Sequence, residues 1–213
     1  PYALPGDAFA TYEPNLFDVP TGKQIKPDLD RFEHEWLRPR PRWSPDGARV
    51  AYQQDDRGHQ RFRVIAIEAA TGAVRTIIDE KTDTFIWTTH TENLNLSLVN
   101  WLTNSQEIIY TSESNGWRHL YLIDAAAGKL KNPITSGPWV VRGIDRIDET
   151  NRQVWFQASG VYPDQDPYLL HHGRASFDGG KPVWLTKGDG QHSLQYAPDG
   201  KHYIDTYSRV DLP

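Results

Sequence analysis

Short hydrophobic runs bounded by turn residues recur along the whole chain. Residues 62–67 (Phe-Arg-Val-Ile-Ala-Ile) and 120–123 (Leu-Tyr-Leu-Ile) have the length and the β-branched or aromatic content of strands. An acidic residue followed closely by a glycine comes after each run, at residues 68–72 and 124–128. This order favours a tight turn, because the carboxylate bonds nearby backbone and glycine accepts a positive φ. The pattern therefore predicts antiparallel strands joined by hairpins.

A longer unit occurs four times. Its clearest copy is Trp-Ser-Pro-Asp-Gly followed by a hydrophobic strand, at residues 43–52, and the other copies are at residues 101–110, 147–156 and 196–205. The copies begin roughly 50 residues apart, and a period of about 40–50 residues with four short strands per unit is typical of β-propeller blades. We therefore predict an all-β chain, a β-propeller fragment built of four-stranded antiparallel blades.

The repeat divides the chain into about three complete blades and two partial ones. We expect one partial propeller domain, residues 1–213, with complete blades at residues 38–85, 97–138 and 139–190 and partial blades at 1–37 and 191–213. These blades are too few to close a ring, since propellers typically have 4–8. The missing blades are therefore expected outside this chain, or the fragment associates through its edge strands. A helical period is found at Leu29–Leu37, where a short helix is expected.

Composition excludes several classes of function. The 213 residues carry a net charge of −5, which argues against nucleic acid as the main partner because a phosphate-binding face needs clustered Lys and Arg. No apolar run approaches the ~18 residues of a membrane span. Cysteine is absent, which removes disulfides, thiolate metal sites and a Cys nucleophile. Methionine is absent too, so we expect the chain to begin inside a longer protein, where a signal peptide would not be seen.

Catalytic and cofactor motifs are absent from the sequence. There is no Gly-x-Ser-x-Gly nucleophile motif, and Gly188-Asp189-Gly190 lacks the Lys-Ser/Thr of a phosphate-binding loop. The adjacent His171 and His172 would point to opposite faces of a strand, which suits no shared metal ion. The other histidines that stand out, His59, His119 and His192, lack metal-ligand spacing, so structural or solvent-facing roles are favoured. We predict no catalytic residue, no metal site and no cofactor.

Two glutamates are candidates for binding a substrate. Glu33 and Glu35 lie in an acidic segment, residues 28–36, that precedes a blade and could project from the propeller face. Carboxylates placed there could bind the ammonium group of a substrate. The alternative, which the sequence favours, is a solvated charged loop. Residues 55–61 are similarly interpreted as a polar hairpin loop between the second and third strands of a blade.

Several strings between the repeats resemble one protease family. They are Asn-Gly-Trp-Arg-His-Leu-Tyr-Leu at residues 115–122, Trp-Phe-Gln-Ala-Ser-Gly at 155–160, His192-Ser193, and Asp-Thr-Tyr-Ser at 205–208. In order and interval they resemble the N-terminal β-propeller region of dipeptidyl peptidase IV-like serine proteases of the prolyl oligopeptidase superfamily, bacterial type. The resemblance covers essentially all 213 residues.

This resemblance implies an eight-bladed propeller followed by an α/β-hydrolase domain. The parent would be a serine peptidase that removes dipeptides, often with Pro or Ala second, and its catalytic Ser, Asp and His would lie after residues 205–208. This fragment alone is therefore expected to be inactive. Its implied role is to gate substrate access and to help position the peptide N-terminus. The implied partners are the peptide and the hydrolase domain, a homodimer is left open, and the implied location is periplasmic or secreted.

Two departures from the family pattern limit what can be carried over. The family binds the substrate amine with adjacent glutamates on a short helix, whereas His34 separates Glu33 from Glu35. The family's aromatic–Arg pair also has no counterpart at residues 91–96. Two other functions stay open: a non-enzymatic periplasmic scaffold that binds a protein partner, and the propeller of a related oligopeptidase or acylaminoacyl peptidase.

Overall fold

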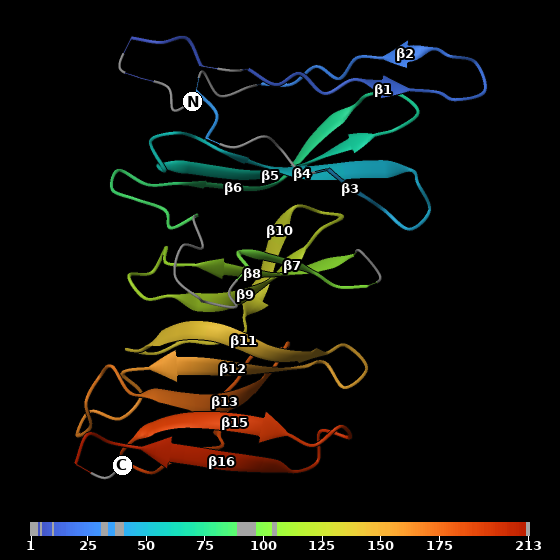
Figure 1. The fold of residues 1–213 in the computed structure, drawn as a ribbon. Coiled ribbons are helices and arrows are strands. Elements are labelled where there is room, and N and C mark those ends of the chain that lie inside the picture. Colours follow the sequence, from blue (N-terminus) through green and yellow to red (C-terminus); the bar gives the residue numbers. More distant parts are fainter. Residues whose placement is uncertain are drawn as a thin grey trace. The chain divides into compact units, whose positions relative to one another are not determined.

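The computed structural model describes residues 4, 6–9, 11–30, 34–36, 41–88, 97–103 and 106–211. Every regular element in these ranges is a β-strand (Figure 1). This part of the chain accordingly contains no helix long and apolar enough to cross a membrane. The chain divides into two compact units, residues 1–89 with 125–129 and residues 90–124 with 130–213.

The first unit holds a two-stranded hairpin and a four-stranded antiparallel sheet. The hairpin consists of β1 (Leu16–Phe17) and β2 (Gln24–Ile25), and the sheet, in the order of its pairing, of β3 (Arg42–Trp43), β4 (Arg49–Asp55), β5 (Arg61–Glu68) and β6 (Val74–Lys81). The centre of β5 is buried on both faces. Val50, Tyr52, Ile65 and Ile67 form the core of this sheet, and Leu16 of the hairpin packs against it.

Turn chemistry sets the register between β3 and β4. The Gly47 N–H donates to the Ser44 carbonyl at 2.9 Å, and Gly47 has a φ of 69°, which glycine adopts without strain. The Asp46 carboxylate accepts from the Ser44 hydroxyl and from the Ala48 N–H. Both bonds lower the pKa of Asp46, and the bond from the Ser44 hydroxyl has the larger effect. The Trp-Ser-Pro-Asp-Gly motif therefore forms a turn through contacts between neighbouring residues. Because these contacts are local, the turn can be predicted from the sequence.

The second unit holds two four-stranded antiparallel sheets and a two-stranded hairpin. Its strands are β7 (Val99–Trp101), β8 (Glu107–Ser112), β9 (His119–Asp124) and β10 (Lys129–Pro133) in the first sheet, β11 (Val140–Asp148), β12 (Gln153–Ser159), β13 (Leu170–Ser176) and β14 (Val183–Trp184) in the second, and β15 (Gln191–Tyr196) and β16 (Tyr203–Ser208) in the hairpin. In both sheets the strands pair in chain order, which is the expected arrangement of a propeller blade.

Apolar side chains from the two sheets of this unit share one core. Ile109 and Leu120 of the first sheet are fully buried in the same cluster as Val154 and Phe156 of the second. Trp139, on the connection between the sheets, stacks on Phe156 with ring centroids 5.7 Å apart. Aromatic pairs of this kind add to the stabilisation from area burial alone. The connection is thereby held between the sheets that it joins.

A histidine and a threonine fasten this connection. The Thr135 hydroxyl oxygen accepts from the Leu120 N–H at 3.0 Å and lies 3.0 Å from Nδ1 of His119, while Nε2 of His119 lies 2.9 Å from the Gly137 carbonyl. Because a carbonyl only accepts, Nε2 carries the proton and Nδ1 accepts from the threonine. Burial lowers the pKa of His119, which favours this neutral form.

The connection between β14 and β15 has a similar arrangement, but a different histidine bonds the glycine carbonyl. The Thr186 hydroxyl again receives a backbone N–H, from His172, and lies 3.3 Å from Nδ1 of His171. The Gly188 carbonyl, however, bonds Nε2 of His192 at 2.8 Å, and Nδ1 of His192 lies 2.8 Å from the Asp205 carboxylate. The Gly188 carbonyl and the Asp205 carboxylate thus hold the His192 ring from both sides. Burial lowers the pKa of His171 to about 4, and the nearby charges of His192 and His172 act in the same direction.

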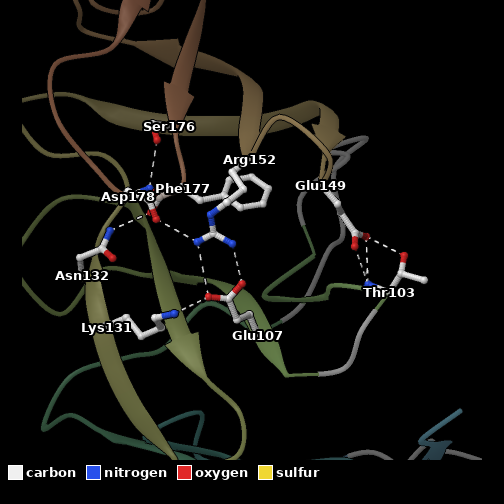
Figure 2. Close-up of polar contacts among 9 residues, drawn as sticks. All are labelled: Thr103, Glu107, Lys131, Asn132, Glu149, Arg152, Ser176, Phe177 and Asp178. Atoms are coloured by element: carbon white, nitrogen blue, oxygen red, sulfur yellow. Dashed lines mark hydrogen bonds and ion pairs between the residues drawn. The ribbon is translucent and has the colours of Figure 1, made fainter.

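An ion-pair network also joins the two sheets of the second unit (Figure 2). Arg152, in the turn between β11 and β12, donates to Glu107 at the start of β8 at 2.8 Å and to Asp178 at 2.9 Å. Lys131 of β10 donates to the same Glu107 at 2.6 Å. The hydrogen bonds from Arg152, followed by those from Lys131, lower the pKa of Glu107. One buried carboxylate thus anchors two strands of its own sheet to a turn of the next.

The predicted all-β fold with four-stranded antiparallel blades is confirmed, with three four-stranded sheets and two two-stranded hairpins among the described residues. The short helix expected at Leu29–Leu37 is wrong where the structure describes that segment. Residues 29–30 and 34–36 are not helical, and Glu35 forms an antiparallel bridge with Asp56. Pairing with a distant strand end has overridden the weak local helical period.

Replacing the central arginine of this network should destabilise the protein. We expect Arg152→Ala in the full-length protein to lower the free energy of unfolding by about 1–3 kcal/mol, because the buried Glu107 keeps only Lys131. The loss should shrink as the pH falls below 4.5, since the folded-state pKa of Glu107 is lowered and protonation there ends its contribution. Urea unfolding followed by tryptophan fluorescence measures both effects.

Arg209→Ala is the matched control, because Arg209 pairs with Asp211 on the surface. Its loss should be clearly smaller than that of Arg152→Ala. Equal losses for the two variants, or a loss for Arg152→Ala that persists unchanged at pH 3, would contradict the role assigned to Glu107.

Candidate functional site

The candidate site lies where the turn between β4 and β5 meets the segment before β3. Residues 34–36 run antiparallel to residues 55–57: the Trp36 N–H donates to the Asp55 carbonyl at 2.8 Å, and the Arg57 N–H donates to the His34 carbonyl at 2.9 Å. A segment far back in the sequence is therefore fixed to the end of the hairpin by its backbone. Side chains from both segments are brought together there.

Glu35, one of the two glutamates singled out in the sequence, is buried in this arrangement. Only 8% of its surface is exposed, and its Oε1 accepts from Nε2 of Gln54 at 3.1 Å. The expectation of a solvated charged loop is therefore wrong for Glu35, because the bridge to Asp56 draws its side chain in. Glu33, the second candidate, lies outside the described residues.

A second buried carboxylate lies on the hairpin itself. Asp55 has a side chain only 11% exposed, with Oδ2 3.5 Å from Nδ1 of His59. The same His59 nitrogen lies 2.8 Å from the Thr88 hydroxyl. Burial raises the pKa of Asp55, and the neighbouring Thr88 and His59 oppose that rise only in part. Residues 55–61 do form the polar turn that the sequence indicates, but two of its polar side chains are held inside.

Aromatic rings contact the polar side chains of this turn. The His59 ring contacts the rings of Trp36 and Phe85, with centroids 5.0 and 5.4 Å away. The guanidinium of Arg57 lies 4.0 Å from the centre of the Phe9 ring and 5.2 Å from that of Trp36. We call this group the hairpin site and define it by its members: Phe9, His34, Glu35, Trp36, Asp55, Arg57, His59, Phe85 and Thr88.

The hairpin site combines features that binding sites use. A carboxyl group with a burial-raised pKa, next to an imidazole and among aromatic rings, is a candidate functional group with a physical basis. Asp55 and His59 could exchange hydrogen bonds with a polar ligand, and Trp36 and Phe85 could pack on its apolar part. In the part of the chain that the structure describes, no three His, Asp or Glu side chains are grouped as metal ligands.

The sequence located part of this site and missed the rest. Glu35 and the turn at residues 55–61 were both visible as polar segments, but nothing local indicated that they touch. Phe9, Phe85 and Thr88 were missed, because they come from segments with no distinctive pattern of their own. The loop at residues 91–96, where the resemblance would place an aromatic–Arg pair, lies outside the described residues.

Comparison with known proteins matches the whole chain to one family. The family described as the dipeptidyl peptidase IV (DPP IV) N-terminal region matches residues 1–213. This chain belongs to the DPP IV N-terminal region family. The resemblance identified in the sequence is thereby confirmed, and the blades described above are those of a β-propeller fragment.

Known proteins similar to this chain carry the name dipeptidyl peptidase 4. The crystal structure of Porphyromonas gingivalis dipeptidyl peptidase 4 superposes with a TM-score of 0.68 at 18% identity, over 93% of this chain and 26% of that one. A Neosartorya fischeri protein named "Probable dipeptidyl peptidase 4" is 29% identical over 95% of this chain and 26% of its own length. Dipeptidyl peptidase 4 of Trichophyton rubrum is 22% identical over 77% of this chain and 20% of its own. The chain thus spans about a quarter or less of these relatives.

The raised pKa of Asp55 gives a prediction about stability. A carboxyl whose folded-state pKa is raised costs stability once the pH rises through that pKa. We therefore expect Asp55→Asn in the full-length protein to raise the melting temperature, with a larger gain at pH 8 than at pH 4. Differential scanning calorimetry at the two pH values measures this.

Asp79→Asn is the matched control on the neighbouring strand. Its hydrogen bonds with Arg61 lower the pKa of Asp79, so its replacement should reduce stability at pH 8. A fall in melting temperature for Asp55→Asn similar to that for Asp79→Asn would show that Asp55 is a stabilising ion-pair partner instead of a strained buried acid.

Proposed function

We propose that this chain is the non-catalytic propeller portion of a serine-type dipeptidyl peptidase. In this role it gates access to the active site and helps to position the N-terminus of the peptide for release of a dipeptide. The observation that carries the proposal is the family match over residues 1–213, together with relatives named dipeptidyl peptidase 4. The catalytic Ser, Asp and His belong to an α/β-hydrolase domain elsewhere in the parent protein, and the propeller alone is inactive.

Gating and positioning follow from general properties of such a domain. A passage through or beside packed blades admits a thin extended chain and excludes a folded protein by its size. Acidic side chains held in a partly desolvated place bind the N-terminal ammonium of the peptide, and this fixes which peptide bond reaches the nucleophile. At the hairpin site the fold removes two carboxylates, Glu35 and Asp55, from bulk water. Glu35 is already bonded to Gln54, so the carboxylates that bind the ammonium are expected elsewhere in the parent protein.

The activity is tested with the full-length protein that carries this chain. We expect release of p-nitroaniline from Gly-Pro and Ala-Pro p-nitroanilides, and little or none from the N-acetylated forms, because a blocked amine cannot bind the carboxylates. A serine-directed inhibitor such as a fluorophosphonate should abolish release. No cleavage of either free substrate by an inhibitor-reactive enzyme would reject the dipeptidase function. Cleavage of the acetylated forms instead would favour an acylaminoacyl peptidase or oligopeptidase.

The role of Glu35 is tested separately. Glu35 is already bonded to Gln54 and stands one residue away from Glu33, so we expect Glu35→Gln to change kcat/KM for Gly-Pro-p-nitroanilide by less than about threefold. Glu33→Gln should behave likewise. The measurement is steady-state kinetics on free and N-acetylated substrates side by side. A large rise in KM confined to the free-amine substrate would place the amine-binding carboxylate at the mutated position.

A further inference from the structure

Arg57 is a half-buried arginine whose guanidinium has no acceptor in the part of the chain that the structure describes. Its Nε is buried and unpartnered. Among the residues that the structure describes, none accepts a hydrogen bond or forms an ion pair with its guanidinium, whose neighbours are the rings of Phe9 and Trp36. An arginine has five N–H donors, and a buried donor left unbonded is costly, so such a group calls for an explanation.

Two aromatic rings contact the guanidinium of Arg57. The Phe9 ring lies 4.0 Å from its central carbon and the Trp36 ring 5.2 Å, and both are distances at which arginine is attracted to an aromatic face. The Arg57 backbone N–H also donates to His34, so the turn that bears the side chain is fixed. The planar donor fork of a guanidinium is pre-organised, so less freedom is lost for each hydrogen bond when it binds.

No carboxylate of its own hairpin forms an ion pair with Arg57. Oδ1 of Asp56 accepts the backbone N–H groups of Gln60 and Arg61, both at 2.8 Å, and Oδ2 of Asp55 faces His59. Arg61, four residues further along the same hairpin, makes the contrast clear. It forms a two-pronged pair with Asp79 at 2.9 and 2.8 Å.

We propose that Arg57 binds a carboxylate group of the ligand at the hairpin site. A carboxylate offers two coplanar oxygens that match the donor fork of a guanidinium, and such charged, two-pronged hydrogen bonds are the strong ones. This assignment rests on the proposed function, in which the ligand is a peptide. The carboxylate then belongs either to the C-terminus of a short peptide or to an acidic side chain, and the site favours peptides that carry one.

Binding of uncharged and charged peptides to the full-length protein tests this proposal. The probes are triglycine, triglycine amide and Gly-Gly-Asp amide, measured by isothermal titration calorimetry. We expect the wild type to bind at least one of the two carboxylate-bearing peptides more tightly than triglycine amide. Arg57→Ala should weaken that binding about tenfold or more and leave triglycine amide unchanged. Preference for triglycine indicates a C-terminal carboxylate, and preference for Gly-Gly-Asp amide indicates a side chain.

Two further variants separate binding from folding. Arg57→Lys keeps the charge but loses the fork, so it should lose most of the preference while retaining the melting temperature. Arg61→Ala, on the same hairpin, should lose stability and keep the preference, because its partner is Asp79. The proposal is overturned if the wild type shows no preference for a carboxylate, or if Arg57→Ala weakens acid and amide peptides equally.

These outcomes are independent of catalysis. A protein that shows Arg57-dependent carboxylate binding but releases no dipeptide would retain this inference and reject the proposed function. A protein that releases dipeptides without any Arg57-dependent preference would do the reverse.

Discussion

Burial of sheets on both faces is the constraint on which the rest of this structure depends. The centres of β5 and β8 are buried without alternation, so neither strand has a face that water can cover. Such a sheet is stable only when other elements cover both of its sides, and in the second unit the neighbouring sheet does so on one of them. The stability of the second unit therefore depends on contacts between its two sheets.

This constraint explains where the polar groups lie. Although some, such as Arg63 and His172, are buried within strands, many of the charged and hydrogen-bonding side chains lie at the strand ends and in the connections. There they do two different things. Glu107 with Arg152 joins one sheet to the next, and Thr135 with His119 holds the connection between them. At the hairpin site the polar groups are only partly satisfied. Asp55 is held with a raised pKa, and unfavourable burial of this kind is retained at functional sites more often than elsewhere.

Features that depend on local contacts could be predicted from the sequence, whereas features that depend on long-range pairing could not. The strands and their order were predictable because turns such as Ser44–Gly47 are local, and each copy of the repeat carries its own turn residues. The segment around Glu35 was not, because its conformation is decided by pairing with Asp56, which a helical period cannot reveal. Burial of Glu35 and the rings around Arg57 arise from the same long-range pairing. The sequence could therefore identify the family and the blades, but it could not assemble the site.

Arg57 and Arg61 show why local sequence is a poor guide at such a place. Both are arginines on one polar hairpin, and a sequence-based interpretation treats them alike. Arg61 reaches across to Asp79 on the adjacent strand of its own sheet, so its charge is used within the fold. Arg57 instead contacts the rings of Phe9 and Trp36, which provide no oxygen acceptor. Aromatic contacts can orient a guanidinium without satisfying its donors, and this difference makes Arg57 the residue at which a ligand would complete the structure.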